Sequence, residues 1–220
     1  MIDWGWLADH LPALVYRTGQ HLYLTAIAVS IGLAISFALG VAAVRVRGLY
    51  LPSAVLTGLV YTIPSLALFA ALVPIIGLSI LTAEIPLVLY TLVILFRNVV
   101  AGFDAVPPDV EDAADGMGFD ATKRLLRVEI PLAVPLIVAG VRIASVSTIG
   151  LVTITATLGD AFGGLGFFIY EGARRSFATE IYAGAIPTIL LALALDRLFV
   201  RLQHRLTPWE RPRTAGTAPG

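Results

Sequence analysis

The strongest constraint on this chain is a set of long segments without any Asp, Glu, Lys or Arg. Residues 18–44 and 48–83 contain none of these four side chains. A membrane-crossing helix needs about 20 mostly apolar residues, and 58% of all residues are hydrophobic whereas 14% are charged. A water-soluble chain of 220 residues would expose much of that apolar surface. The sequence therefore predicts an integral membrane protein and excludes a soluble enzyme, a disordered chain and a nucleic-acid binder.

Five apolar segments are long enough to cross a membrane, so the predicted fold class is an all-α polytopic membrane protein with about five transmembrane helices. Six spans are the alternative, but residues 48–83 barely accommodate two crossings and a connection. We place the spans at about 22–44, 53–73, 85–104, 132–157 and 181–201.

Basic residues in the connections predict the orientation of these spans. With five spans, ten cations fall on one side of the membrane and three, Arg17, Arg174 and Arg175, fall on the other. Cytoplasmic segments carry the excess of Lys and Arg, so the N-terminus is expected outside and the C-terminus in the cytosol. The ten cations are Arg45, Arg47, Lys123, Arg124, Arg127, Arg197, Arg201, Arg205, Arg211 and Arg213.

Small side chains recur at every fourth position in two of the spans. Such rows let helix backbones approach closely in a membrane, and we expect them to mediate helix packing rather than to face lipid. The rows are Gly32, Ser36 and Gly40 in the first span and Gly140, Ala144 and Thr148 in the fourth.

The connection 105–131 is predicted to form two short helices on the cytosolic side. Acidic residues follow Pro108 and suit the positive end of a helix dipole. A pair of glycines ending at Gly118 is expected to break this helix, and Asp120 to cap a second one that ends at Pro131. Two helices of this kind fit a groove on another protein, and a solvated amphipathic loop is the alternative.

The residues of this connection resemble the EAA motif of ABC-importer permeases, which reads Glu-Ala-Ala, three residues, Gly, nine residues and Ile-x-Leu-Pro. The spacing agrees throughout, and the departures at positions 112, 128 and 130 are mild. The corresponding residues are Asp112, Ala113, Ala114, Gly118, Val128, Ile130 and Pro131.

Shorter strings resemble the osmoprotectant branch of that family, whose permeases import glycine betaine, choline or carnitine. These strings lie at 62–69, 95–98, 116–118 and 139–142, and the overall likeness extends over about 20–205.

The resemblance implies the type I ABC importer permease fold, a multi-pass location in a bacterial cytoplasmic membrane, and a permease domain over 1–205 in which residues 105–131 couple to an ATPase. It further implies a second permease subunit, either a copy of this chain or a paralogue, and two ATPase subunits that each grip one such loop. A separate extracytoplasmic protein is expected to deliver the substrate. Residues 206–220 are polar and rich in Pro and Gly, so they are expected to form a disordered cytosolic tail.

The chain is expected to be a non-catalytic transport subunit that binds no cofactor itself. ATP and Mg²⁺ belong to the partner ATPase, because a phosphate-binding loop requires Gly-Lys-Ser/Thr and the one lysine, Lys123, stands between Thr122 and Arg124. The three histidines are scattered and the chain has no cysteine, so no metal site is predicted. No Ser, His and Asp set falls on one side of the bundle, so no catalytic residue is assigned.

Three residues within the spans are candidates for a gate, or for a relay from the coupling loop to the pathway. Arg97 lies about two turns from the cytosolic end of the third span and Arg142 about three turns into the fourth, and intramembrane cations usually face the protein interior. Pro64 is expected to bend the second span because it removes a backbone hydrogen bond. For the arginines, pairing with helix carbonyls or extension toward the cytosol is the alternative.

The outward connection 158–180 is predicted to lie over the mouth of the pathway and, by the resemblance, to dock the binding protein. Its aromatic rings can offer their faces to a quaternary ammonium group, and an aromatic belt at the membrane interface is the alternative. The candidate mouth residues are Asp160, Phe167, Phe168, Tyr170 and Glu171.

Three other functions are weighed against an osmoprotectant permease. A permease for another small solute, such as an amino acid, would keep the same fold and coupling loop. A membrane-embedded enzyme and a passive channel belong to different classes, and neither needs a loop that docks an ATPase.

Overall fold

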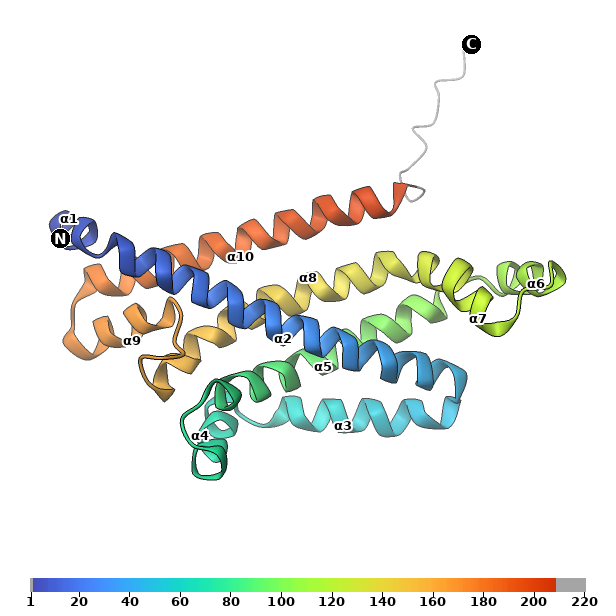
Figure 1. Ribbon diagram of the computed structural model, residues 1–220, viewed down its shortest axis with the longest axis horizontal. Coiled ribbons are helices and arrows are strands. Elements are labelled where there is room, and N and C mark those ends of the chain that lie inside the picture. The colour runs from blue at the N-terminus through green and yellow to red at the C-terminus, as the bar shows by residue number, and fades with distance from the viewer. Residues whose placement is uncertain (1, 209–220) are drawn as a thin grey trace, which may run out of the picture.

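The computed structural model describes residues 2–208, and no strand occurs in this part of the chain. Figure 1 shows its helices running along one another as an elongated bundle. The expected tail 206–220 lies outside the described residues from position 209 onward. The elements are α1 (Trp4–Asp9), α2 (Leu11–Arg45), η1 (Arg47–Leu49), α3 (Tyr50–Thr62), α4 (Ser65–Ile76), α5 (Ile80–Asp104), α6 (Pro108–Gly116), α7 (Ala121–Arg124), η2 (Leu125–Glu129), α8 (Ile130–Ile154), η3 (Thr155–Leu158), α9 (Gly166–Arg175) and α10 (Ala178–Leu206).

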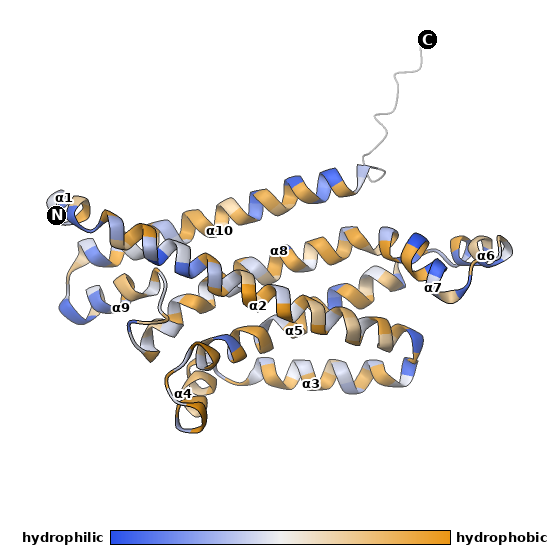
Figure 2. Ribbon diagram, viewed as in Figure 1, coloured by the Kyte–Doolittle hydropathy of each residue, from blue (hydrophilic) through white to orange (hydrophobic). Residues whose placement is uncertain are grey.

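Four helices are long and apolar enough to cross a membrane: α2, α5, α10 and a continuous helix over Ala121–Leu158. The bent pair of α3 and α4 makes a fifth if it counts as one span. Figure 2 shows apolar residues along these helices and hydrophilic residues gathered toward their ends and connections. The predicted all-α class with about five spans is thereby confirmed, and four of the five expected positions fall within one helix.

The second expected span, about 53–73, is interrupted at Pro64, where a bend was predicted. Its two halves, α3 and α4, are bent by 91° at a break that contains Ile63 and Pro64. Pro64 has no N–H and disfavours the helical conformation of the residue before it, and Ile63 accordingly has φ −71° and ψ 129°. The hydroxyl of Tyr90 on α5 donates to the carbonyl oxygen of Ile63. This bond gives the carbonyl oxygen of Ile63 the partner that the interrupted helix does not supply. A backbone carbonyl inside a membrane needs such a partner within the protein.

Helix α5 is the centre of the bundle. Its most apolar stretch is 67% buried, whereas that of α10 is 17% buried. α2 packs along α5, and the hydroxyl of Ser36 donates to the carbonyl of Leu92 at 3.4 Å. α8 packs against α5 where Gly140 lies next to Asn98. The rows of small residues therefore mediate helix packing within the chain, as their spacing predicted.

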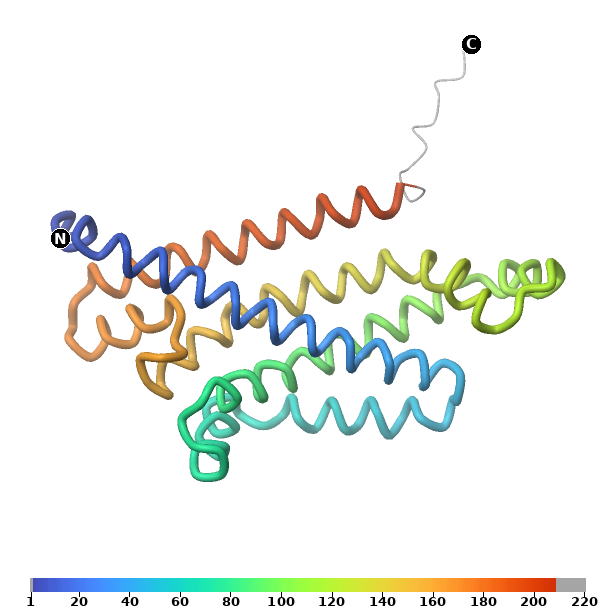
Figure 3. Tube along the Cα trace, in the orientation of Figure 1, coloured from blue at the N-terminus to red at the C-terminus, as the bar shows by residue number. Residues whose placement is uncertain are grey.

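The connection that carries the EAA-like motif lies far from the connection 158–180. Figures 1 and 3 show α6 and α7 at one end of the bundle and α1 and α9 at the opposite end. The long helices α2, α8 and α10 run between the two ends (Figure 3). A partner bound at α6 and a partner bound at α9 would thus be separated by the length of the bundle.

The second short helix of the loop does not end before the fourth span, contrary to expectation. Asp120 caps α7 by accepting a hydrogen bond from the Lys123 N–H at 2.7 Å, as predicted. The helix then continues through the π-helical turn η2 into α8, so Pro131 lies inside a helix of 38 residues. A π-helical turn shifts the backbone pairing pattern just before the position where Pro131 offers no N–H.

Gly140→Ala is expected to lower thermal stability, because an added Cβ would lie 2.5 Å from Cβ of Asn98. Overpacking of this kind costs about 1–3 kcal/mol. Gly19→Ala is the matched control, since a Cβ there meets nothing within 4 Å and alanine favours a helix over glycine by about 1 kcal/mol. The apparent melting temperature of the detergent-solubilised protein should fall for the first variant and stay level or rise for the second. Equal shifts would contradict the packing described for Gly140.

Candidate functional site

The coupling loop is shaped by a turn that only glycine adopts easily. α6 begins at Pro108 with acidic side chains in its first turn and ends at Gly116. Gly118 has φ +75°, in the left-handed region. The N–H of Met117 donates to the carbonyl of Ala113 at 3.0 Å, and the N–H of Phe119 donates to that of Ala114 at 3.1 Å. These bonds close the helix end, so Gly118 determines how α6 is turned relative to α7.

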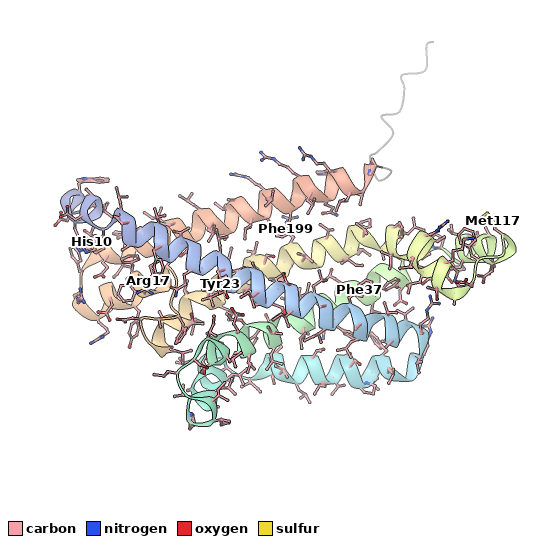
Figure 4. All side chains as sticks on the ribbon, viewed as in Figure 1. His10, Arg17, Tyr23, Phe37, Met117 and Phe199 are labelled. Atoms are coloured by element: carbon pink, nitrogen blue, oxygen red, sulfur yellow. The ribbon has the colours of Figure 1, made fainter. Side chains whose placement is uncertain are left out.

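One face of α6 presents apolar side chains to the outside. Val110, Ala113 and Met117 follow the three- and four-residue spacing of a helix face, and all three are exposed, Met117 by 67%. Ala114, in contrast, is buried. Figure 4 labels Met117 at the tip of the loop, at the far end of the bundle from His10 and Arg17. Of the motif residues, Asp112, Ala113 and Gly118 are exposed, so they lie where a partner can contact them.

A charged network joins this loop to the membrane helices. The buried carboxylate of Glu129 accepts from Arg45 at the end of α2, with Oε2 and Nη2 3.0 Å apart. Its other oxygen, Oε1, lies 2.8 Å from Nε of Arg124. Nη1 of Arg124 in turn lies 2.5 Å from Oδ2 of Asp115 on α6. The network Asp115–Arg124–Glu129–Arg45 therefore ties α6 and α7 to both α2 and the start of α8.

The ion pairs of this network were not predicted from the sequence motif. Glu129 occupies a position at which the motif accepts any residue, and its partners Arg45 and Arg124 lie 84 and 5 positions away. A signal was nevertheless present, since Glu129 is a carboxylate between Val128 and Ile130 at the entrance of an apolar span. A buried charge needs a partner, but the sequence does not say which arginine supplies it.

Arg142 pairs with a side chain rather than with helix carbonyls or the cytosol. Its Nε and Nη2 both donate to the carboxylate of Asp196 on α10, and the Nη2–Oδ2 distance is 3.1 Å. Both side chains are about one-third exposed. The pair links α8 to α10, whose apolar stretch is otherwise the least buried. Asp196 was missed in the sequence, although it is an acid within the apolar segment 181–201.

The other two candidates for a gate or relay line neighbouring cavities. Arg97 is exposed on α5 and borders a cavity of about 400 Å³ between α3 and α5. Pro64 borders a cavity of about 440 Å³ at the break between α3 and α4. The structure thus brings Arg97 and Pro64 toward one region, whereas Arg142 lies with Asp196 at the contact with α10.

The connection 158–180 does not present its phenylalanines as free aromatic faces. Phe168 on α9 is buried and packs edge-on against Trp6, with ring centroids 6.1 Å apart. The ring of Phe167 lies under the guanidinium of Arg17, 4.2 Å from its centroid. The same guanidinium donates to the backbone carbonyl of Asp160. Phe167 and Phe168 therefore stabilise the end of the bundle at α1 and α9 and form no open aromatic cage in it.

Tyr170 and Glu171 lie on α9 beside two exposed arginines. Tyr170 is 40% exposed. Glu171 accepts from Arg174 at 2.9 Å and from Arg175 at 3.1 Å. Of the five predicted mouth residues, only Tyr170 and Asp160 are exposed.

His21 anchors the turn before α9 and was assigned no role from the sequence. It is fully buried, with Nε2 2.9 Å from the carbonyl oxygen of Ile149 on α8. Its Nδ1 accepts from the N–H of Leu165 at 3.2 Å. Both ring nitrogens are thus used to hold the turn before α9 against α2 and α8.

Comparison with known proteins identifies the family. The model of the family described as binding-protein-dependent transport system inner membrane component matches residues 30–211. The chain belongs to this family, whose members are the permease subunits of ABC importers. Among curated relatives, the osmoprotectant import permease protein OsmW of Salmonella typhimurium is 38% identical over 92% of this chain and 96% of that protein. The glycine betaine/carnitine/choline transport system permease protein OpuCB of Bacillus subtilis is 33% identical over 89% of each.

Solved structures confirm the type I ABC importer permease fold. An inward-facing structure of the MetNI methionine ABC transporter matches with a TM-score of 0.81 and 19% identity, over 90% of this chain and 98% of that one. An amino acid ABC transporter with histidines matches with a TM-score of 0.74 and 17% identity, over 93% and 99% of the two chains.

Glu129→Gln is expected to destabilise the chain, because it leaves Arg45 without a charged partner and removes one of the two carboxylates that bind Arg124. Breaking a buried ion pair from one side costs about 3–5 kcal/mol, and the side chain of Arg45 is 32% exposed, so we expect about 3 kcal/mol. The apparent melting temperature should then fall by about 5 °C or more. Asp109→Asn, at an exposed acid of α6, is the control and should change it little. A similar fall for both variants would contradict the network.

Proposed function

We propose that this chain is the membrane-spanning subunit of an ATP-driven importer for quaternary-ammonium osmoprotectants such as glycine betaine, choline or carnitine. The observation that carries this proposal is the likeness of nearly the whole chain to permeases named for these solutes. An amino acid is the other cargo considered. The structures of amino acid transporters are under 20% identical to this chain, so they support the fold and not the cargo.

The orientation that we propose has the N-terminus outside and α6 and α7 in the cytosol. Lys123, Arg124 and Arg127 lie at this end, and the positive-inside rule favours it as the cytoplasmic one. Arg174 and Arg175, which are both 64% exposed, lie on α9 at the opposite end. In a bacterial cytoplasmic membrane, α9 would then face the side from which substrate arrives.

The proposed partners follow from this orientation. The apolar face of Val110, Ala113 and Met117 is the surface that we assign to a groove on the ATPase, which binds ATP and Mg²⁺. A second permease subunit completes the pathway, and a separate substrate-binding protein docks at the α9 end. A membrane enzyme or a passive channel would have no use for the exposed coupling face.

The geometry supports a simple route for the mechanical step. When the ATPase subunits close on ATP, they displace α6, and the salt bridges of Asp115, Arg124 and Glu129 carry that displacement to the start of α8. Arg45 carries it to α2 in the same way. Because the helix over Ala121–Leu158 is continuous, movement at its cytosolic end reaches the outer end as a rigid tilt. The spans thereby change from an inward-open to an outward-open arrangement.

Uptake of labelled glycine betaine tests this function in a host that lacks its own osmolyte importers. The chain is co-expressed with its ATPase and binding protein, and uptake is measured at high osmolarity. Gly118→Val should lower uptake at least tenfold, because a β-branched residue at φ +75° distorts the turn that orients α6. Gly116→Val is the matched control, since Gly116 ends α6 without a left-handed backbone and an added Cβ meets nothing within 4 Å.

The control variant should retain most of the uptake. Absence of uptake by the unmodified complex would contradict the cargo, and equal uptake by both variants would contradict the role of the turn.

A further inference from the structure

Two neighbouring cavities open beside the break in the second span. The cavity of about 440 Å³ lies where Ile63 and Pro64 face α5 and α8. The cavity of about 400 Å³ lies between α3 and α5 and includes Arg97. Both are lined by Tyr61 and Thr62, so they adjoin. Further polar side chains of the larger cavity are Ser65, Tyr90, Thr91, Ser147 and Thr148.

Two tyrosines form an aromatic corner in the larger cavity. The rings of Tyr61 and Tyr90 meet edge to face, with centroids 5.8 Å apart and an interplanar angle of 70°. Tyr90 is buried and its hydroxyl is held by the carbonyl of Ile63, whereas Tyr61 is 51% exposed. Tyr90 therefore fixes the corner, and Tyr61 offers a ring face to whatever enters.

Arg97 brings a positive charge to the adjoining cavity. It lies seven residues before the end of α5, about 10 Å along the helix axis. Its side chain makes no hydrogen bond or ion pair with any residue between positions 2 and 208. An ionisable side chain at this depth is costly unless it meets water, a partner or a substrate. It is therefore available to an anionic group that passes through the cavity.

The ring face of Tyr61 and the guanidinium of Arg97 suit the two ends of a molecule that carries a quaternary ammonium group and a carboxylate. A quaternary ammonium group has no N–H to donate, so aromatic ring faces are its usual protein partners. A guanidinium binds a carboxylate with paired, charge-assisted hydrogen bonds. We propose that the joined cavities form a transit site for a zwitterionic solute, with its ammonium group against Tyr61 and its carboxylate toward Arg97. The inference rests on the proposed function and adds to it the residues that contact the cargo.

Two glycines keep this site open. Gly58 lines the smaller cavity and Gly150 the larger one. An added Cβ at either position meets nothing within 4 Å. Because both positions leave room for a Cβ, larger side chains there are direct probes of whether solute passes.

The experiment measures glycine betaine uptake and ATP hydrolysis together, in liposomes that contain the permease–ATPase complex with binding protein and betaine outside. Arg97→Gln and Tyr61→Leu should each lower the betaine imported per ATP at least tenfold, while ATP hydrolysis stays within twofold of the unmodified complex. Arg97→Lys and Tyr61→Phe should recover most of the loss, since they keep the charge and the ring. Gly58→Leu and Gly150→Leu should lower uptake at least tenfold. Gly48→Leu, outside both cavities and with nothing within 4 Å of its Cβ, should not.

The possible outcomes separate this inference from the proposed function. If the unmodified complex imports no glycine betaine, the proposed cargo fails and the transit site fails with it. If it imports betaine and Arg97→Gln imports as much per ATP, the transit site alone is overturned. If uptake and ATP hydrolysis fall in parallel, with the complex dissociated on gel filtration, Arg97 and Tyr61 serve assembly, and the inference is likewise overturned.

Discussion

Inside a membrane, every backbone amide and carbonyl needs a partner within the protein, and this requirement determines the architecture of the chain. It explains why the described residues form long helices. Small residues recur where α2 and α8 meet α5 because helices in a membrane associate through close packing of their backbones. The requirement for backbone partners also governs the place where the second span breaks. At Ile63 and Pro64 the helix loses its pairing, and the hydroxyl of Tyr90 supplies a partner from α5. The break is thus held by a neighbouring helix, and a cavity lies beside it.

At the end of the bundle that carries α6 and α7, a buried charge also needs partners. Glu129 is 3% exposed, and its carboxylate is held by arginines from two different segments. One of these arginines also binds Asp115 on α6. Because these ion pairs join the loop to α2 and α8, the loop cannot shift without moving one of these helices. This is the property that a coupling element requires, because a flexible loop would absorb a displacement imposed by a bound partner.

Much of the fold was predictable from the sequence, because the length of each apolar segment and the charges that flank it can be read from neighbouring positions. The four continuous spans, the small-residue packing rows, the first loop helix and the cap at Asp120 follow from such local signals. The size of the bend at Pro64 did not, because it depends on whether another helix can satisfy the freed carbonyl. The continuation of the helix through Pro131 depends on a π-helical turn that composition does not reveal. Glu129 pairs with Arg45, which lies 84 positions away, and Arg142 pairs with Asp196, which lies 54 positions away. Only the structure shows which of these charged side chains meet.

The central claim is that Met117 lies at a cytosolic surface bound by an ATPase, and a cysteine at this position tests it most directly. The chain has no cysteine, so Met117→Cys gives a single thiol, and Arg174→Cys on exposed α9 gives the matched control. In intact cells, a membrane-impermeant thiol reagent should label the cysteine at 174 and leave the one at 117 unlabelled. In membranes with the full complex, a short bifunctional reagent should cross-link the cysteine at 117 to the ATPase and the one at 174 to no ATPase. Labelling of position 117 from outside, or cross-linking of the ATPase through position 174, would contradict the proposed orientation and coupling.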